Sequence, residues 1–399
     1  MKVGVIVDNE LNNDKRVLRE IAILKEHGYE IFVLCFGFGK KYLNPPDGII
    51  IDRINISKKT KDILFFFLNT IPIYEWLWAV RIKKFINSNK IDLLHVHDLY
   101  MSRASAWGIK KYGKKIPMIL DLHENYPFAV STYRWATGIF RRIIARPSKW
   151  GKKEKQYLGF PDKIIVLSEN YRNHLMKKYP DIQKSRFGVF PNYPDLTTTS
   201  SPKLSEVKFP FVKNAPIIFY FGVVAERRGI FNALKAFETV ISKGYDVNFL
   251  IIGPIDKADR NKFNAVLVSQ VLKKRLIYIP WIDLSELPAY LELSDICIAP
   301  FVKNPQHESG IANKIFDYML GSKPLIVSDC QPQRDLTEKT NCGIVFSNSN
   351  ELVEAMIKLL NDCNLRQNLG KNGYNAIIKD YHLGKIKENL LTVYRELKD

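Results

Sequence analysis

The chain has 399 residues, 46% of them hydrophobic and 25% charged, which is ordinary for a globular protein. This composition excludes a wholly disordered chain, a collagen-like chain and a small disulfide scaffold. The chain carries 60 Lys and Arg against 41 Asp and Glu, a formal net charge of +19. Such an excess indicates an anionic partner: nucleic acid, a phosphate-bearing substrate or an acidic membrane surface. A basic surface that is simply solvated remains the alternative.

The cysteines and the apolar runs bear on the compartment. The five cysteines are scattered, odd in number and without metal-ligand spacing, which favours reduced thiols in a cytoplasmic chain over a structural zinc site. No secretory signal pattern follows Met1. The longest apolar stretch, 63–80, is interrupted by Asn69, Pro72 and Glu75, and falls short of the roughly 20 apolar residues that span a bilayer. It is compatible with a segment that lies on a membrane.

The first half alternates short apolar runs with amphipathic segments. After the first run, Asn12, Asn13 or Asp14 can cap a helix that places Val17, Ile21 and Leu24 on one face and ends at Gly28. Apolar strands separated by helices predict parallel βαβ units. The strands are predicted at 2–7, 30–36, 91–97, 116–122, 163–168 and 186–190.

The same alternation restarts after the polar stretch 195–210, which has the composition of a linker. The chain therefore predicts an α/β protein of two doubly wound domains. In such open parallel sheets, ligands bind beyond the carboxyl ends of the strands. The predicted strands are 216–222, 246–253, 276–280, 295–300, 323–329 and 342–346; the predicted helices lie near 230–243, 259–274, 285–293, 313–320, 350–361, 364–379 and 381–397.

The segment 308–329, ESGIANKIFDYMLGSKPLIVSD, is the strongest candidate for chemistry. Lys314 lies in the first turn of a helix expected to begin near Asn313, where free N–H groups and the helix dipole attract phosphate. Asp317, one turn later, is placed to accept hydrogen bonds from a ribose. An ordinary capped helix with solvated charges is the alternative interpretation.

This segment resembles the donor-binding motif of the retaining glycosyltransferases of family 4, which have the GT-B fold. The resemblance implies that Asp317 binds the nucleotide ribose and that Lys314 binds phosphate. The first acidic position of the motif falls on Ser309, and we assign its contact with the donor sugar to Glu308, one residue earlier. The backbone N–H groups of Gly310 and Ile311 are expected at the diphosphate.

A second stretch, FGVVAERRGIFNALKAF at 221–237, resembles the family's other phosphate-binding segment. Gly222 ends a strand, and Arg228 occupies the position of the diphosphate-binding Lys. Val223 replaces an Arg of the family, so that one of two cations is missing, and Arg227 is expected to compensate. The alternative is an exposed pair of arginines.

Two strand ends of the first half, in 93–105 and 117–127, also resemble the family. The resemblance implies that His123 contacts the donor sugar. His97 and Asp98 are expected to support it or to line the acceptor side. Lys15 or Arg16 is expected to face an anionic acceptor, with a capped helix and solvated charges as the alternative.

The resemblance implies a GT-B fold of two Rossmann-like domains that face each other across a cleft. The first, 1–197, takes the acceptor side, with a closing helix at about 381–399 packing back on it; the second, 210–380, binds the nucleotide sugar. The implied activity is retaining transfer of a hexose-type sugar to a lipid-linked glycan in cell-surface polysaccharide synthesis. No metal and no further cofactor are expected. The catalytic groups would be His123, Glu308, Arg228 and Lys314.

Two segments, 63–80 and 134–155, are candidates for membrane contact, and the second carries eight Lys or Arg against one Glu. They predict a cytoplasmic enzyme peripheral to the inner face of the cell membrane; helices with basic outer faces are the alternative. No nucleic-acid-binding motif is present. Two other functions stay open: a catalytically silent partner of a glycan assembly complex, favoured by Val223 and Ser309, and a GT-B UDP-sugar epimerase.

Overall fold

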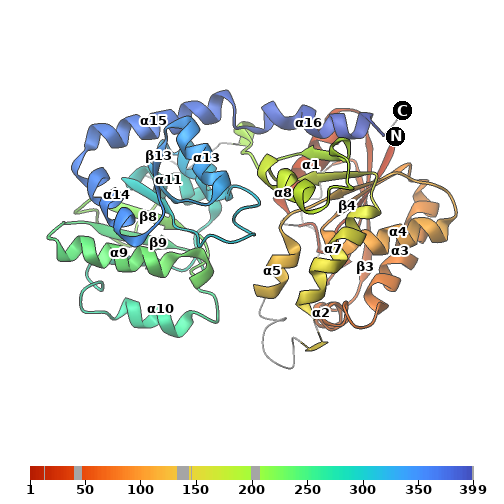
Figure 1. Ribbon diagram of the computed structural model, residues 1–399, viewed down its shortest axis with the longest axis horizontal. Coiled ribbons are helices and arrows are strands. Elements are labelled where there is room, and N and C mark those ends of the chain that lie inside the picture. The colour runs from red at the N-terminus through yellow and green to blue at the C-terminus, as the bar shows by residue number, and fades with distance from the viewer. Residues whose placement is uncertain (13, 40–46, 133–142, 145, 199–206, 398–399) are drawn as a thin grey trace. The chain divides into compact units, whose positions relative to one another are not determined.

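The computed structural model describes residues 1–12, 14–39, 47–132, 143–144, 146–198 and 207–397 (Figure 1). The chain divides into two compact units, each with its own core. Unit 1 comprises Met1–Pro191 and Ile386–Asp399, and unit 2 comprises Asn192–Lys385. The first boundary thus lies a few residues before the predicted linker. No helix in the described part of the chain is long and apolar enough to cross a membrane.

Unit 1 is built on a seven-stranded parallel sheet in the order β3-β2-β1-β4-β5-β6-β7. The order reverses between β1 and β4, which places their carboxyl ends at a switch point where ligands bind in such sheets. The strands are β1 (Lys2–Ile6), β2 (Glu30–Gly37), β3 (Ile49–Asn55), β4 (Leu93–His97), β5 (Met118–Asp121), β6 (Lys163–Val166) and β7 (Phe187–Val189).

The helices of unit 1 follow the predicted pattern where it was given. In α1, Asp14 accepts a hydrogen bond from the backbone N–H of Val17, and the predicted apolar face is buried. From Ile386 on, α16 packs with unit 1, although it is far from that unit in sequence. The helices are α1 (Lys15–Glu26), α2 (Lys58–Phe66), α3 (Ile73–Asn89), α4 (Ser102–Tyr112), α5 (Tyr126–Thr132), α7 (Trp150–Gly159), α8 (Glu169–Lys178) and α16 (Leu383–Arg395).

Unit 2 has a six-stranded parallel sheet in the order β10-β9-β8-β11-β12-β13, with the reversal between β8 and β11. Successive residues of β8 contribute to two different hydrophobic clusters, so both faces of the sheet are covered. The strands are β8 (Ile217–Phe221), β9 (Asn248–Ile252), β10 (Leu276–Ile279), β11 (Ile296–Ala299), β12 (Leu325–Ser328) and β13 (Gly343–Phe346). The helices are α9 (Ile230–Ser242), α10 (Arg260–Leu267), α11 (Leu287–Leu293), α12 (Asn313–Leu320), α13 (Gln331–Thr340), α14 (Ser349–Asn361) and α15 (Cys363–Lys379).

Candidate active site

In unit 2, a glycine follows each of the strands β8 and β9, in a backbone conformation that other residues rarely adopt. Gly222 follows β8 with φ 134°, and a Cβ there would lie 3.0 Å from the Nζ atom of Lys314. Gly253 follows β9 with φ 143°, and its Cβ would lie 2.2 Å from the carbonyl oxygen of Gly222. The backbone is therefore bare beside the Lys314 ammonium, as a phosphate-binding turn requires.

Lys314 lies in the first turn of α12, and its Nζ atom is buried without a hydrogen-bond partner. The ammonium stands 3.7 Å from the ring centroid of Tyr220 and 5.2 Å from that of Phe301. Burial and the nearby Arg228 lower the pKa of Lys314 well below its usual value, against a smaller effect of Asp317. An anion bound beside this nitrogen would reverse that shift.

Arg228 ends the turn Glu226–Arg228 that leads into α9, and its guanidinium lies over the same Phe301 ring, 5.5 Å from the centroid. Gly229 comes next with φ 74°; a Cβ there would lie 1.6 Å from the carbonyl oxygen of Pro300. Glycine thus lets this turn pack against the segment after β11, which carries Phe301. Arg227 instead forms an ion pair with Asp256 at 2.5 Å, which differs from the expected phosphate-facing position.

The loop before α12 has internal partners for both candidates at the first acidic position. The Ser309 hydroxyl is buried and donates to the carbonyl of Pro305 at 2.6 Å. The Glu308 carboxylate accepts from the backbone N–H of Gln331, at 3.2 and 3.3 Å, at the start of α13. Gly310 and Ile311 lie just before Ala312, the N-cap of α12, and Asp317 lies half-buried one turn after Lys314.

One residue of this loop was not foreseen. The His307 ring packs on Phe301 with centroids 4.6 Å apart, and its Nδ1 lies 2.7 Å from the carbonyl oxygen of Val302. Burial, with help from Arg228 and its neighbours, lowers the pKa of His307 to about 4. It is therefore a neutral side chain beside the two cations, and the motif comparison gave no signal for it.

In unit 1, three of the predicted residues, His97, Asp98 and His123, meet at the carboxyl ends of β4 and β5, beside Asp121. The Nδ1 of His97 lies 2.9 Å from the Nε2 of His123. The same Nε2 is 3.4 Å from Asp121, and the other ring nitrogen of His123 is 3.9 Å from Asp98. Burial would lower the pKa of His123, but Asp98 and Asp121 outweigh it and raise that pKa to about 9. The two carboxylates thus favour the charged form of His123.

Arg16 explains why Asp121 is ionised although it is fully buried. Its guanidinium donates to both carboxylate oxygens of Asp121, at 2.7 and 2.8 Å, and to the carbonyl of Phe190 at 2.8 Å. This ion pair, with His123, holds the pKa of Asp121 well below its usual range despite burial. Arg16 therefore has an internal partner rather than the expected acceptor-facing position, whereas Lys15 is exposed.

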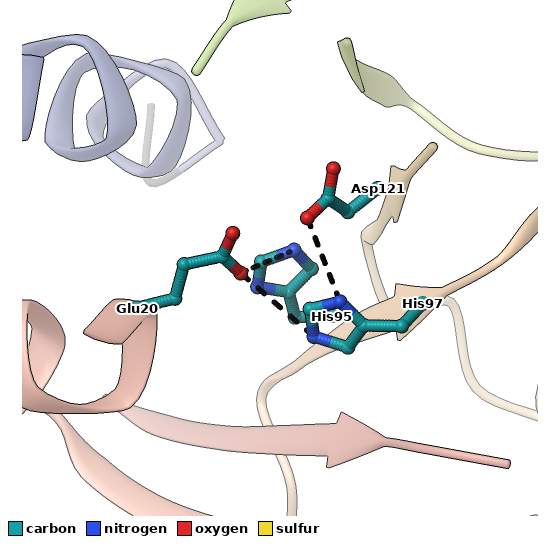
Figure 2. A group of neighbouring side chains, drawn as sticks. All are labelled: Glu20, His95, His97 and Asp121. Carbon is teal, nitrogen blue, oxygen red and sulfur yellow. Dashed lines mark ion pairs between the residues drawn. The ribbon is translucent and has the colours of Figure 1, made fainter. Parts of the chain in front are cut away.

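Glu20, His95, His97 and Asp121 offer ligand atoms within 4.8 Å of one another, and Figure 2 shows them gathered between α1, β4 and β5. A metal ion would have to compete with existing contacts of this group. The buried Tyr394 hydroxyl, whose pKa is raised by burial, lies 2.7 Å from His95 Nδ1. This contact occupies Nδ1 whether the hydroxyl donates or accepts, so a metal ion could reach His95 only through Nε2.

Arg16 opposes a metal as well. It occupies both oxygens of Asp121, and its Nε lies 3.2 Å from a carboxyl oxygen of Glu20. A divalent cation at the same carboxylates would stand against this fixed charge.

Two family models match the chain in succession. The model described as Glycosyltransferase Family 4 matches residues 15–198, and the model described as Glycosyl transferases group 1 matches residues 203–376. This chain belongs to the GT-B group 1 glycosyltransferases.

Relatives of this glycosyltransferase agree with that assignment. It is 21% identical over 287 residues to the alpha-D-kanosaminyltransferase of Streptomyces kanamyceticus, covering 71% of each chain. It is 24% identical over 204 residues to the capsular polysaccharide biosynthesis glycosyltransferase CapM of Staphylococcus aureus, covering 48% of this chain and 49% of CapM. Among solved structures, sucrose-phosphate synthase from Thermosynechococcus elongatus is 15% identical with a TM-score of 0.74, covering 100% of this chain and 99% of that one. Anabaena HepE in complex with UDP is 13% identical with a TM-score of 0.73, covering 99% and 100%. These structures share the fold.

Proposed function

We propose that this glycosyltransferase binds a nucleoside-diphosphate sugar in unit 2 and transfers the sugar, with retention, to a hydroxyl of a lipid-linked glycan in cell-surface polysaccharide synthesis. Two proteins of similar fold have been solved with nucleotide ligands. HepE is in complex with UDP, and a trehalose-6-phosphate protein of E. coli is bound with UDP-2-fluoro glucose. One relative is named for capsular polysaccharide biosynthesis. These names support the donor class and the pathway class.

The buried ammonium of Lys314 is the observation that carries the proposal. A buried cation without a hydrogen-bond partner costs free energy in the ligand-free protein. Arg228 shares the Phe301 ring with it, so two cations converge beside the bare backbone of Gly222. A diphosphate supplies charge for both cations, and the free N–H groups at the start of α12 add to its binding.

The other residues then take roles along the donor. Asp317, one helical turn beyond Lys314, accepts hydrogen bonds from the ribose, and Glu308 contacts the sugar. In unit 1, the imidazolium of His123 takes part at the sugar. The departing phosphate assists deprotonation of the acceptor hydroxyl, while Arg228, Lys314 and the helix dipole stabilise its charge. The proposal needs no metal ion for this step.

Thermal shift with UDP, GDP, ADP and their sugars tests the donor class. A ligand at 100 times its dissociation constant stabilises the protein by about 2.7 kcal/mol. NMR of the product then tests retention, because an α-linked donor must give an α-linked product. No shift with any nucleotide would contradict the donor site. Nucleotide binding without transfer supports a silent partner, and sugar isomerisation without acceptor supports an epimerase.

We also propose that unit 1 docks on an anionic membrane. On α3, Ile73, Trp76 and Val80 are 52%, 57% and 40% exposed and recur at helical spacing on one face. Ile63 of α2 and Ile71 before α3 add exposed apolar surface. Such an exposed apolar face suits the boundary between headgroups and acyl chains.

A basic depression of about 490 Å³ adjoins this face, lined by Val80, Lys83, Lys84, Asn87, Tyr112 and Lys114. Its lysines suit anionic headgroups beside the apolar side chains. The second predicted segment meets the first, because Thr70 donates to the carbonyl of Ile144 and Lys153 donates to Asn69. Arg134, Arg141 and Arg142 of that segment lie outside the described residues. This docking supports a cytoplasmic enzyme on the inner face of the membrane.

A further inference from the structure

A continuous row of polar side chains runs through unit 1 from the end of β5 to α16. It contains His123, His97, Glu20, His95 and Tyr394 in that order, and Figure 2 shows its middle. All except His123 are almost completely buried. The positions of the protons along this row follow from which atoms can donate and which can accept.

Tyr394 lies at the inner end of the row, with its hydroxyl 2.7 Å from His95 Nδ1. When this hydroxyl donates, His95 carries its ring proton on Nε2. That Nε2 lies 3.7 Å from Oε2 of Glu20 and cannot accept a proton from it. The nitrogen that can exchange a proton with Glu20 is therefore Nε2 of His97, which lies 3.8 Å from the same oxygen. In the described part of the chain this nitrogen has no hydrogen-bond partner, while the other oxygen of Glu20 lies 3.2 Å from Nε of Arg16.

The contact between His97 and His123 restricts the outer end. Two ring nitrogens at 2.9 Å need one donor and one acceptor. When charged His123 donates, His97 holds its proton on Nε2 and can donate it to a Glu20 carboxylate. When His97 donates, its Nε2 is bare and can accept the proton of a Glu20 carboxyl group. The two arrangements contain the same number of protons.

We propose that Glu20, His97 and His123 form a proton relay, in which Glu20 and His123 exchange one proton through the two ring nitrogens of His97. The O–H bond at Glu20 Oε2 breaks as an N–H bond forms at His97 Nε2. The N–H bond at His97 Nδ1 breaks as one forms at His123 Nε2. A shift of the Glu20 carboxyl by about 0.8 Å closes the longer gap to hydrogen-bond distance.

The charges around the relay pull the proton in opposite directions. Asp98 after β4 and Asp121 on β5 favour the proton on His123. Burial, with a smaller effect of Asp121, raises the pKa of Glu20 well above its usual value, against Arg16 on the same helix. These influences act on opposite ends of the relay.

The consequence for catalysis rests on the proposed function. An anionic group of the substrate beside His123 draws the proton outward, and its loss returns the proton to Glu20. His123 thereby changes charge without exchange with solvent. Glu20 and His97 are positioning residues, because they act through His123.

Two-bond ¹H–¹⁵N NMR of the full ¹⁵N-labelled chain reports the protonated nitrogens of each histidine ring, with His97→Gln and His123→Gln for assignment. We expect His95 protonated on Nε2 throughout, and His97 protonated on Nε2 whenever His123 is charged. Glu20→Gln removes the carboxylate that pairs with this charge, so the His123 titration should move down by about one pH unit. The alkaline limb of kcat should move with it, while KM for the nucleotide sugar stays unchanged.

Glu26→Gln, on the exposed side of the same helix, should leave both titrations unchanged. An unaltered His123 titration in Glu20→Gln would overturn the relay, as would His95 protonated on Nδ1. One equivalent of Zn²⁺ bound by the wild type and lost in Glu20→Gln would show a metal site instead. If Glu20→Gln does not fold, the wild-type spectra test the relay on their own. A charged His123 together with a His97 protonated on Nδ1 would contradict it. The NMR outcome holds even if transferase activity proves absent.

Discussion

Lys314 keeps its charged atom buried although the ligand-free protein offers no hydrogen bond to it in its described part. A buried charge of this kind lowers the free energy of unfolding of the ligand-free protein and favours binding of an anion, which supplies the missing partner. The bare backbone at Gly222 gives that anion access.

Lys314→Met should therefore raise the melting temperature of the ligand-free protein. The pKa of Lys314 is lowered in the folded state, so the unfolded chain binds more protons, and stability rises with pH up to the unfolded pKa of about 10.4. Below that pH the lysine is destabilising, and removing it should gain about 1 kcal/mol, or about 2–4 °C, while the thermal shift caused by nucleotide is lost. Calorimetric scans between pH 6 and about 10 measure both effects. The exposed Lys235→Met should show neither, and a lower melting temperature for Lys314→Met would contradict this account.

The two neighbouring arginines should differ in their effect on nucleotide binding. Arg228→Ala removes a cation beside Lys314 and should weaken nucleoside-diphosphate binding by about 1.5–3 kcal/mol, the value of a charge-assisted hydrogen bond. Arg227→Ala is the matched control, because this arginine is paired with Asp256. Isothermal titration measures the affinities. Equal losses for the two variants would mean that both arginines reach the phosphates.

The motifs singled out Arg228, Lys314 and His123 as candidates, because the chemistry of a strand end or a helix start is visible in adjacent residues. They could not give the partner of Arg16, since Asp121 lies 105 positions further along the chain. The same holds for Tyr394 and His95, which only the packing of α16 brings together. Buried pairing over such separations is a property of the fold and leaves no local pattern.

Among the elements, α3 has the most unusual surface. Its buried side holds Tyr74, Trp78 and Ile82 in the core of unit 1, while Trp76 faces outward. Glu75 is buried too, and is paired with Arg103 and Tyr157. The helix is therefore held firmly in place while its outer face stays apolar.

Trp76→Ser should reduce binding to anionic vesicles tenfold or more, since burial of a large apolar side chain contributes about 1.5–3 kcal/mol. Co-sedimentation with vesicles that contain phosphatidylglycerol measures the change. Val268→Ser, at a 72% exposed position of unit 2, is the control and should bind as the wild type does. Undiminished binding of Trp76→Ser would exclude this face as the docking surface.

Strands were predicted well because a strand buried on both faces is a continuous apolar run. β3 was not predicted: its sequence, IIIDRIN, mixes charge with apolar residues and it lies at the sheet edge. α13 was missed because its sequence, QPQRDLTEKT, is mostly polar and gives almost no apolar periodicity. α10 is shorter than predicted, since turns replace the helix after Leu267.

At the scale of the whole molecule, the net charge of +19 acts over long distances. It should attract the protein to anionic vesicles at low salt, and this attraction should weaken as the Debye length falls from about 10 Å at 0.1 M to about 3 Å at 1 M. Lys83→Ser with Lys84→Ser should flatten the salt dependence more than Lys371→Ser with Lys379→Ser, an exposed pair in unit 2. Equal slopes for the two pairs would assign the salt dependence to total charge alone.

The discontinuous make-up of unit 1 has a consequence for biosynthesis. Unit 2 is a single uninterrupted stretch inserted between the two segments of unit 1, so it can fold while the end of the chain is still in the ribosome. Unit 1 must wait for α16, which brings Leu390, Leu391 and Tyr394 to their buried positions. A nascent chain stopped just short of this helix would carry a finished nucleotide-binding half beside an open hydrophobic surface, and chaperones and proteases would meet it in that state.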